Sequence, residues 1–500
     1  MRHPHKMISA IIGTVLFGAA GLSYSSGTGS DNGSVSYGIA AGQANQEQFA
    51  TAIGFFALPS WDDTGNGNTA LGYTTMYFNQ TGSYNTAVGV EALNQNTTGY
   101  GNTAIGTDSL IGNKTGSFNT ASGTNALSCG ITGSANTASG AFALSGGARP
   151  AGAFQSTCPA VMGSGSDNTA DGYQALNQNT TGTDNAATGY QALYSNTTGN
   201  YNTAAGSSAL LSNTTGYQNT ASGYGALSSS TVGNHNTASG FYALYSNTNG
   251  SSNTADGDDA LPYNTSGYEN TASGSEALFS NTIGNSNVAL GLQALYSNTT
   301  GSNNIAVGTG AGYNLTYGNN NIDIGNQGVA TESGKIRIGT PATQTATYIA
   351  GIESAKITGA AVYVTSSGQL GVLASSERYK TAIAPMGANT QKLQQLRPVT
   401  FHLKSDPSGT RQYGLIAEEV AKVYPELVIR DAAGTIQGVR YDELAPMLLN
   451  EVQKQQQEVQ KQEQVNSVQA AKIDSLERQL AGIQAALVKL QPRDELVAQR

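Results

Sequence analysis

Charge is scarce in this sequence, and basic charge is almost missing from its first two thirds. Charged residues make up 11% of the 500 residues, whereas soluble domains typically contain roughly 25%. Between Asp31 and Gly334 the only basic residues are Lys114 and Arg149, and the net charge of the chain is -9. A nucleic-acid-binding surface needs a basic patch or stripe, so the sequence excludes nucleic acid as a partner.

Long apolar runs are missing too, with one exception near the N-terminus. Arg2 and Lys6 precede an apolar stretch of about 16 residues, Met7 to Leu22, whose core is followed by small residues. This order is typical of an export signal, so we expect residues 1–25 to be a signal peptide. An uncleaved anchor is the alternative, although the stretch is short for a membrane span. We therefore expect a secreted or cell-surface protein without a membrane span after signal removal.

Cysteine is nearly absent, because the chain contains only Cys129 and Cys158. An even number of cysteines in an exported chain favours a disulfide. Both cysteines flank or lie within the one interruption of an otherwise regular repeat. We predict that they are bonded to each other, with two free thiols as the alternative.

The abundant residues are Gly, Asn, Thr, Ser and Ala, and they recur with a fixed period. An Asn that begins an Asn-Thr-Ala unit, or a variant of that unit, occurs fifteen times at a spacing of 17, in two blocks. The gap from Asn136 to Asn168 is 32, which equals one repeat plus 15 inserted residues, at about 141–160. The fifteen residues are Asn68, Asn85, Asn102, Asn119, Asn136, Asn168, Asn185, Asn202, Asn219, Asn236, Asn253, Asn270, Asn287, Asn304 and Asn321.

Glycine and alanine columns show how one repeat would fold. A Gly lies three residues before and another four residues after each of these Asn, so two backbone positions per repeat need positive φ or close chain approach. An inward Ala, such as Ala87, and an apolar pair, such as Ala92-Leu93, complete the unit. Each repeat is predicted to form two short strands and two turns. Neighbouring repeats must stack to share a core, which favours an all-β solenoid at 65–334 over disorder, after an N-terminal segment at 26–64.

The repeat contains glycosylation sequons and resembles calcium-binding repeats in its Gly and Asn content, but neither function is expected. Asn-Thr-Thr sequons recur at one turn of the repeat, so glycosylation is disfavoured. The Asp column of calcium-binding repeats is missing, and no His, Cys or carboxylate cluster recurs at metal spacing. We expect neither a metal nor a cofactor. The sequons begin at Asn96, Asn179, Asn196, Asn213 and Asn298.

The repeats resemble the head repeats of trimeric autotransporter adhesins, where Asn-x-Ala-x-x-Gly coils form a parallel β-roll. The resemblance covers about residues 65–325 and implies that three chains pack together. The repeat of this sequence is 17 residues long, whereas those coils are usually shorter.

After a predicted β-rich neck at 335–374, the sequence resembles the S74 peptidase family, the intramolecular chaperone domains of phage tailspikes and tail fibres. The resemblance rests on Ser-Ser-Glu-Arg-Tyr-Lys at 375–380, Tyr-Gly-Leu-Ile-Ala-Glu-Glu-Val at 413–420, Tyr-Pro-Glu-Leu-Val at 424–428 and Gly-Val-Arg-Tyr-Asp-Glu-Leu at 438–444. It implies a small α+β chaperone domain at 375–446. Ser376 stands where that family usually has Asp.

That family cuts its own chain with a Ser–Lys pair, which implies Ser375 as nucleophile, Lys380 as general base and cleavage between Ala374 and Ser375. A lysine serves as base only when neutral, so burial must lower its pKa from about 10.4. A subunit interface could supply that burial. An uncleaving structural relic is the alternative, and no turnover enzyme is expected.

The last segment, 447–492, has a heptad pattern that starts at Leu448 and ends at Leu490. The middle of its seam is polar, at Gln462, Asn466 and Gln469, and its C-terminal half is apolar, at positions such as Ile473 and Leu480. This predicts a coiled coil, with a core helix of a globular domain as the alternative.

Together these features predict an exported homotrimeric fibre or adhesin-like protein whose C-terminal domain drives assembly and cleaves itself. The alternative is a phage-type tail fibre or tailspike that binds a host receptor, a surface glycan or a protein. The stalk has no repeated carboxylate column, so a carbohydrate-cleaving site is disfavoured.

The predicted disulfide can be tested by thiol labelling. In the native exported protein without reductant, neither Cys129 nor Cys158 should react with a maleimide, and both should react after reduction and unfolding. Labelling of both thiols in the native protein would contradict the prediction.

Overall fold

The computed structural model describes most of the chain. It covers residues 34–42, 49–59, 64–130, 132–147, 164–350, 352, 361–365, 367–431 and 433–490. The predicted signal peptide, Cys158 and most of the predicted insertion lie outside the described residues. The chain divides into two units, Met1–Thr347 and Tyr348–Arg500, which we describe separately.

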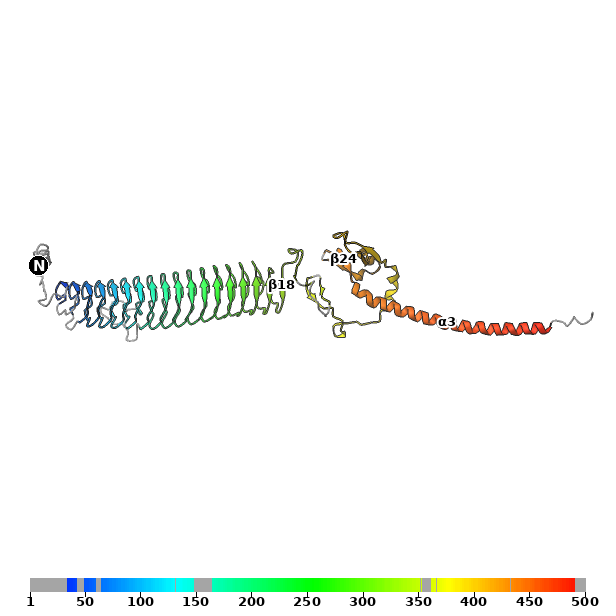
Figure 1. Ribbon diagram of the computed structural model, residues 1–500, viewed down its shortest axis with the longest axis horizontal. Coiled ribbons are helices and arrows are strands. Elements are labelled where there is room, and N and C mark those ends of the chain that lie inside the picture. Colours follow the sequence, from blue (N-terminus) through cyan, green and yellow to red (C-terminus); the bar gives the residue numbers. More distant parts are fainter. Residues whose placement is uncertain are drawn as a thin grey trace, which may run out of the picture. The chain divides into compact units, whose positions relative to one another are not determined.

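The first unit is a parallel β-solenoid, which confirms the predicted fold. Figure 1 shows its short strands side by side along one face of the stacked coils. The described residues form eighteen three-residue strands, each paired in parallel with the strand of the next coil. These are β1 (Val35–Tyr37), β2 (Thr51–Ile53), β3 (Thr69–Leu71), β4 (Thr86–Val88), β5 (Thr103–Ile105), β6 (Thr120–Ser122), β7 (Thr137–Ser139), β8 (Thr169–Asp171), β9 (Ala186–Thr188), β10 (Thr203–Ala205), β11 (Thr220–Ser222), β12 (Thr237–Ser239), β13 (Thr254–Asp256), β14 (Thr271–Ser273), β15 (Val288–Leu290), β16 (Ile305–Val307), β17 (Ile322–Ile324) and β18 (Ile336–Ile338).

The sheet is longer than the 17-residue pattern. Strands β1 and β2 precede residue 65, and β18 follows residue 334. The coils at both ends differ in length from 17 residues, so the Asn-Thr-Ala period does not reveal them. The feature they share at the N-terminal end is a Gly of positive φ directly after the strand, as at Gly38 and Gly54.

Each coil contains one strand, not the two that the sequence predicted. The second apolar segment is a turn because alternate residues adopt left-handed backbone, as at Glu91 (φ 54°) and Leu93 (φ 52°). This geometry directs amide groups to both neighbouring coils: the Glu91 N–H donates to Tyr73 O and the Leu93 N–H to Ser109 O, each at 2.9 Å. The turn therefore satisfies its backbone along the stack without forming a strand.

Two buried asparagine columns hold the coils in register. Asn85 Oδ1 accepts two hydrogen bonds from Asn102, one from its backbone N–H at 2.9 Å and one from its side-chain Nδ2 at 3.1 Å. The Nδ2 of Asn85 donates to Gly99 O at 2.9 Å, which closes the coil. A second column acts on the same carbonyl, because Asn96 Nδ2 also donates to Gly99 O at 2.9 Å and to Asn79 Oδ1 at 2.7 Å. We call these two columns the asparagine ladders.

The asparagine ladders also explain the Asn-Thr-Thr sequons, because the Asn of each sequon belongs to the second ladder. Asn96 and Asn196 are fully buried, and Asn179 and Asn213 are buried too. Their side-chain nitrogens donate hydrogen bonds to the glycine that ends the turn. A glycan attached to such a nitrogen would have no space within the folded solenoid.

The two glycine columns have different physical causes. Gly89 has a φ of +137°, and a Cβ there would lie 2.5 Å from Gly106 O of the next coil. Gly99 does not need positive φ, but a Cβ there would lie 2.3 Å from Gly116 O. The first column therefore requires both conformational freedom and space, and the second requires space.

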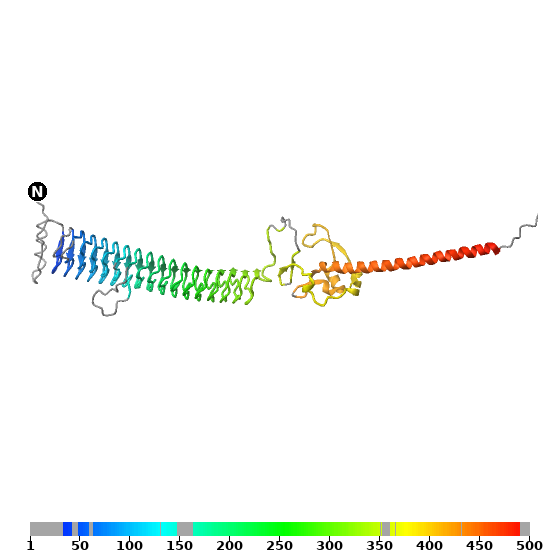
Figure 2. The same cartoon turned by 90° about the horizontal axis from the view of Figure 1, so that it is seen from below.

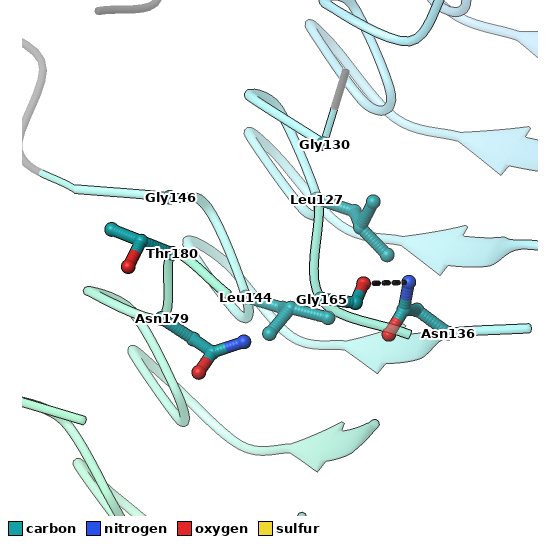
Figure 3. Close-up of a pocket in the computed structure, with 8 residues that line it drawn as sticks. All are labelled: Leu127, Gly130, Asn136, Leu144, Gly146, Gly165, Asn179 and Thr180. Carbon is teal, nitrogen blue, oxygen red and sulfur yellow. Dashed lines mark hydrogen bonds between the residues drawn. The ribbon is translucent and has the colours of Figure 1, made fainter. Parts of the chain in front are cut away.

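The inserted residues do not interrupt the sheet. Strand β7 pairs with β8 in the regular register, Thr137 opposite Thr169. Asn136 Oδ1 accepts the N–H of Asn168 at 3.0 Å, and Asn136 Nδ2 donates to Gly165 O at 3.0 Å. Figure 3 shows this bond beside a cavity of about 10 Å³, where Leu127 and Leu144 approach the second asparagine ladder. The hydrophobic core is therefore continuous across the insertion, with only a small cavity there.

The second unit begins with the rest of the predicted neck. Two-residue strands β19 (Tyr363–Val364) and β20 (Leu370–Gly371) form an antiparallel pair. The predicted strand-like run at 347–350 forms no strand in the described structure, and the run at Ile336–Ile338 belongs to the solenoid as β18.

Small elements and one long helix complete this unit. Its elements are η1 (Glu377–Tyr379), η2 (Gly387–Gln395), β21 (Val399–Phe401), β22 (Gln412–Gly414), α2 (Ala417–Val423), η3 (Pro425–Leu427), β23 (Val428–Arg430), β24 (Ile436–Val439) and α3 (Tyr441–Leu490). Strands β21 and β22 are antiparallel partners, as are β23 and β24. Figure 2 shows most of α3 extending beyond these elements. Across the described residues, no helix has both the length and the apolar character that crossing a membrane requires.

The solenoid ends on a buried carboxylate that should make its last coils sensitive to pH. Asp323 occupies the inward position that is Ala in earlier coils, and its side chain is 1% exposed. Neither carboxylate oxygen has a hydrogen-bond partner among the described residues. Burial, and then the charge of Glu332, raise the pKa of Asp323 to about 6, although Arg337 acts in the opposite direction.

Replacing this carboxylate should stabilise the last coils at alkaline pH. A raised pKa in the folded state means that Asp323 favours folding below its unfolded pKa of about 3.9, and that this contribution is lost as the pH rises through about 6. Asp323→Asn should therefore increase hydrogen-exchange protection of β17 at pH 8, by roughly 3 kcal/mol at most, and change little at pH 4. Asp256→Asn, at an exposed strand position, is the matched control. Equal protection of β17 in wild type and Asp323→Asn at pH 8 would contradict the prediction.

Candidate self-cleavage and assembly site

A single turn of 3-10 helix brings the two predicted catalytic residues together. The turn η1 closes with hydrogen bonds from the Tyr379 N–H to Ser376 O and from the Lys380 N–H to Glu377 O, each at 3.0 Å. Ser375 precedes the N-cap residue of this turn, Ser376, and Lys380 lies directly after the turn. As a result, Lys380 Nζ lies 3.5 Å from Ser375 Oγ, at the long end of hydrogen-bond distance.

The surroundings of this pair are open to solvent in the single chain. Ala374, Ser375, Ser376 and Lys380 are all exposed. The Arg378 guanidinium lies 5.0 Å from the centroid of the Tyr379 ring, which is itself exposed. A Ser hydroxyl and a Lys amine at this separation can perform nucleophilic attack and proton transfer, provided that the amine is neutral.

The same unit contains a small apolar core. Its buried residues come from α2, η3, β23, β24 and the first turns of α3. The residues of this core are Val420, Tyr424, Leu427, Val428, Val439 and Met447. The Tyr424 hydroxyl donates to Asn389 O at 3.1 Å, which ties η2 to this core.

A polar cluster around Thr390 joins η2 to α3. The Thr390 hydroxyl is fully buried and accepts hydrogen bonds from Asn450 Nδ2 at 2.6 Å and Lys454 Nζ at 2.9 Å. It donates to Glu451 Oε1, which also accepts from Lys454 Nζ at 2.7 Å. The hydrogen bond from Lys454, followed by that from Thr390, lowers the pKa of Glu451. This cluster fixes where the long helix begins relative to the small domain.

Two further contacts position the elements between the site and the helix. Arg397 and Glu419 form a bidentate ion pair, with Nη2–Oε1 at 2.5 Å and Nε–Oε2 at 3.1 Å, and this pairing lowers the pKa of Glu419. The Leu415 N–H donates to the Tyr441 hydroxyl at 2.7 Å, which joins the end of β22 to the start of α3. Of the contacts in this unit, only the Glu451–Lys454 pair could be expected from sequence spacing. Arg397 and Glu419 are 22 residues apart, and Leu415 and Tyr441 are 26 apart, so no local pattern indicates them.

Nothing described suggests a metal centre. Within the described residues, no group of three or more His, Cys, Asp and Glu side chains could hold a metal ion. Cys129 is buried in the solenoid and is not a free thiol. Its predicted partner, Cys158, lies outside the described residues, so the pairing stays a prediction.

The comparison with protein families identifies this region. Residues 375–429 match the family model Peptidase_S74, chaperone of endosialidase. The match begins at Ser375 and ends within β23, so it includes the Ser–Lys pair and α2. It confirms the resemblance that the sequence motifs indicated. No curated protein and no solved structure showed significant similarity to the chain.

Proposed function

We propose that this chain is an exported fibre protein whose S74-type domain assembles three copies and then cuts itself free. The observation that carries the proposal is the approach of Lys380 Nζ to Ser375 Oγ, 3.5 Å apart, at the start of the matched segment. Chaperones of this family serve the assembly of tail-fibre and tailspike trimers, and such fibres are extracellular or surface proteins. A solenoid stalk followed by this domain fits that role.

The proposed reaction uses only residues of the chain and water. Neutral Lys380 accepts the hydroxyl proton while Ser375 Oγ attacks the carbonyl carbon of Ala374. The C–N bond of the Ala374–Ser375 peptide then breaks, a proton passes to the departing amine, and an ester joins Ala374 to Ser375 Oγ. Water hydrolyses the ester, which leaves Ala374 as a free carboxylate and a released fragment that begins at Ser375. Because Lys380 is exposed in a single chain, this chemistry depends on burial supplied by assembly.

The helix α3 supports assembly. Its heptad seam residues are largely exposed in the single chain, including Leu480 at 55% and Leu487 at 59%. A helix of this length with an uncovered apolar stripe is typical of a coiled-coil strand. We propose that three copies of α3 pack along this stripe.

A phage-type tail fibre or tailspike is the second candidate, and the S74 match favours it equally. What would separate the two is the predicted export signal, which a phage fibre does not need. Expression of the full chain in a bacterium with and without residues 1–25, followed by fractionation, tests this. Loss of export on removal of residues 1–25 supports the exported fibre, and no export in either case supports the phage-type fibre.

Cleavage should depend on both members of the pair. Ser375→Ala and Lys380→Ala should each leave an uncut chain, whereas Ser376→Ala should still release a fragment of residues 375–500 because its hydroxyl is not the predicted nucleophile. Mass spectrometry of the purified product identifies the new N-terminus. A fragment that begins at Ser376, or no fragment from wild type under assembling conditions, would contradict the assignment.

Cleavage should also depend on the coiled coil. Leu480→Asp with Leu487→Asp places carboxylates in the proposed apolar seam, so trimer formation should fail and cleavage should slow at least about tenfold with the Ser–Lys pair intact. Sedimentation and the rate of fragment release measure the two effects. Glu477→Asp with Arg478→Lys, outside the seam, is the control. Normal cleavage in a monomeric Leu480→Asp, Leu487→Asp variant would show that assembly is not required.

A further inference from the structure

The outward face of the solenoid changes chemistry along its length. In each three-residue strand the middle side chain points inward, and the first and third point outward. In β6–β14 every one of the eighteen outward positions is Thr, Ser, Asp or Ala. In β15–β18 all eight outward positions are aliphatic. They are Val288, Leu290, Ile305, Val307, Ile322, Ile324, Ile336 and Ile338, and we call them the aliphatic ladder.

The parallel register places these side chains in two continuous rows. Val288 is opposite Ile305, and Leu290 is opposite Val307. The same register continues through β17 to Ile336 and Ile338. The rows are uncovered in the single chain: Val307 is 37% exposed, and Ile338 is 72% exposed. A contiguous exposed apolar patch on a soluble protein marks an interaction surface, whereas single exposed apolar residues are common.

We propose that the aliphatic ladder is the surface on which copies of this chain pack against one another. The inference rests on the proposed function, since the assembly domain is what brings copies together. Only 36 residues separate Ile338 from Ser375, so joining the C-terminal domains holds the ladders of different copies at high effective concentration. Identical rows of Val, Leu and Ile suit contact with each other, because no side chain in them needs a hydrogen-bond partner or a counter-charge.

The chemistry of the rows argues against other occupants. A small polar ligand or a glycan would need polar groups for orientation, and the aliphatic ladder contains none. The outward Thr and Ser rows of β6–β14 separate the aliphatic ladder from the first strands of the solenoid. In β2–β5 only the third position is aliphatic, as at Leu71 and Ile105, whereas in β15–β18 both outward rows are. Along the chain, these strands are the part of the solenoid closest to the segment that matches the chaperone family.

Cysteine cross-linking tests the contact directly. The test uses the full chain with Ser375→Ala to prevent cleavage, and Val307→Cys or Ile324→Cys is introduced in separate variants. After sedimentation has shown the trimer, mild oxidation should convert most of each variant into covalent dimers. Thr300→Cys, at an exposed position on the return side of the coil that starts at Asn287, should remain uncross-linked, as should the chain without an added cysteine.

The outcomes separate this inference from the proposed function. A trimer in which neither Val307→Cys nor Ile324→Cys cross-links overturns the aliphatic contact and leaves trimer assembly standing. A monomer overturns both. Cross-linking of Thr300→Cys to the same extent shows random collision and also overturns the inference.

A charge test asks whether the contact is apolar. Ile305→Asp with Ile324→Asp, in the Val307→Cys background, should abolish cross-linking while the C-terminal domain still holds a trimer. Thr237→Asp with Thr254→Asp adds the same charge to the central rows and should leave cross-linking unchanged. Both pairs change outward side chains, so hydrogen exchange should show an intact sheet. Cross-linking that survives Ile305→Asp with Ile324→Asp would overturn an apolar contact.

Discussion

The solenoid depends on buried asparagine amides that must be satisfied by the neighbouring coil. Each coil buries little more than two Ala and one Leu, which supplies only modest hydrophobic stabilisation. The amide of Asn102 instead links to Asn85 Oδ1 on one side and to Gly116 O on the other. A buried amide without a partner costs about 1–3 kcal/mol, so a coil that is one residue too long would lose several such bonds. This constraint accounts for the constant period of 17 within each block of repeats, such as Asn168 to Asn321. The same bonds continue across the insertion, because β7 and β8 pair in register and Asn136 bonds to Asn168 and Gly165.

The sequence predicted the solenoid because the asparagine ladders require identical residues at identical spacing. The prediction missed the coils that adopt the same fold without that spacing. Strands β1 and β2 lack the Asn-Thr-Ala unit, and only Gly38 and Gly54, with φ of 129° and 133°, mark the ends of their strands. The sequence also predicted a second strand at each Ala-Leu pair. An apolar pair does not reveal that Leu93 has positive φ, which is uncommon for a residue with a bulky side chain.

In the candidate site, too, contacts between residues close in sequence could be predicted, and contacts between residues far apart could not. The resemblance to the S74 family paired Ser375 with Lys380, and the 3-10 turn between them keeps the two residues close. The Thr390 cluster could not be predicted, since 61 residues separate Thr390 from Glu451 and nothing in either local segment indicates the other. Lys380 is exposed in the single chain, and the proposed role as a base requires that another surface cover it. If the proposed chemistry operates, the missing component is another copy of the chain, so the reaction can report on assembly.

The two uncovered apolar surfaces lie on opposite sides of the proposed cut. The stripe of α3 follows Ser375, whereas the aliphatic ladder precedes Ala374. Cleavage at this position would remove the helix and its domain from the stalk, and with them any trimer contact that they provide. A stalk that relied on α3 alone would then dissociate. Its central rows of Thr and Ser offer little apolar surface for association, so lasting contact between stalks must come from elsewhere in the solenoid. The four strands nearest the cut carry the aliphatic residues that could supply it. In this arrangement α3, in the released part, would assemble the copies. The aliphatic ladder, in the retained part, would hold the stalks together after cleavage.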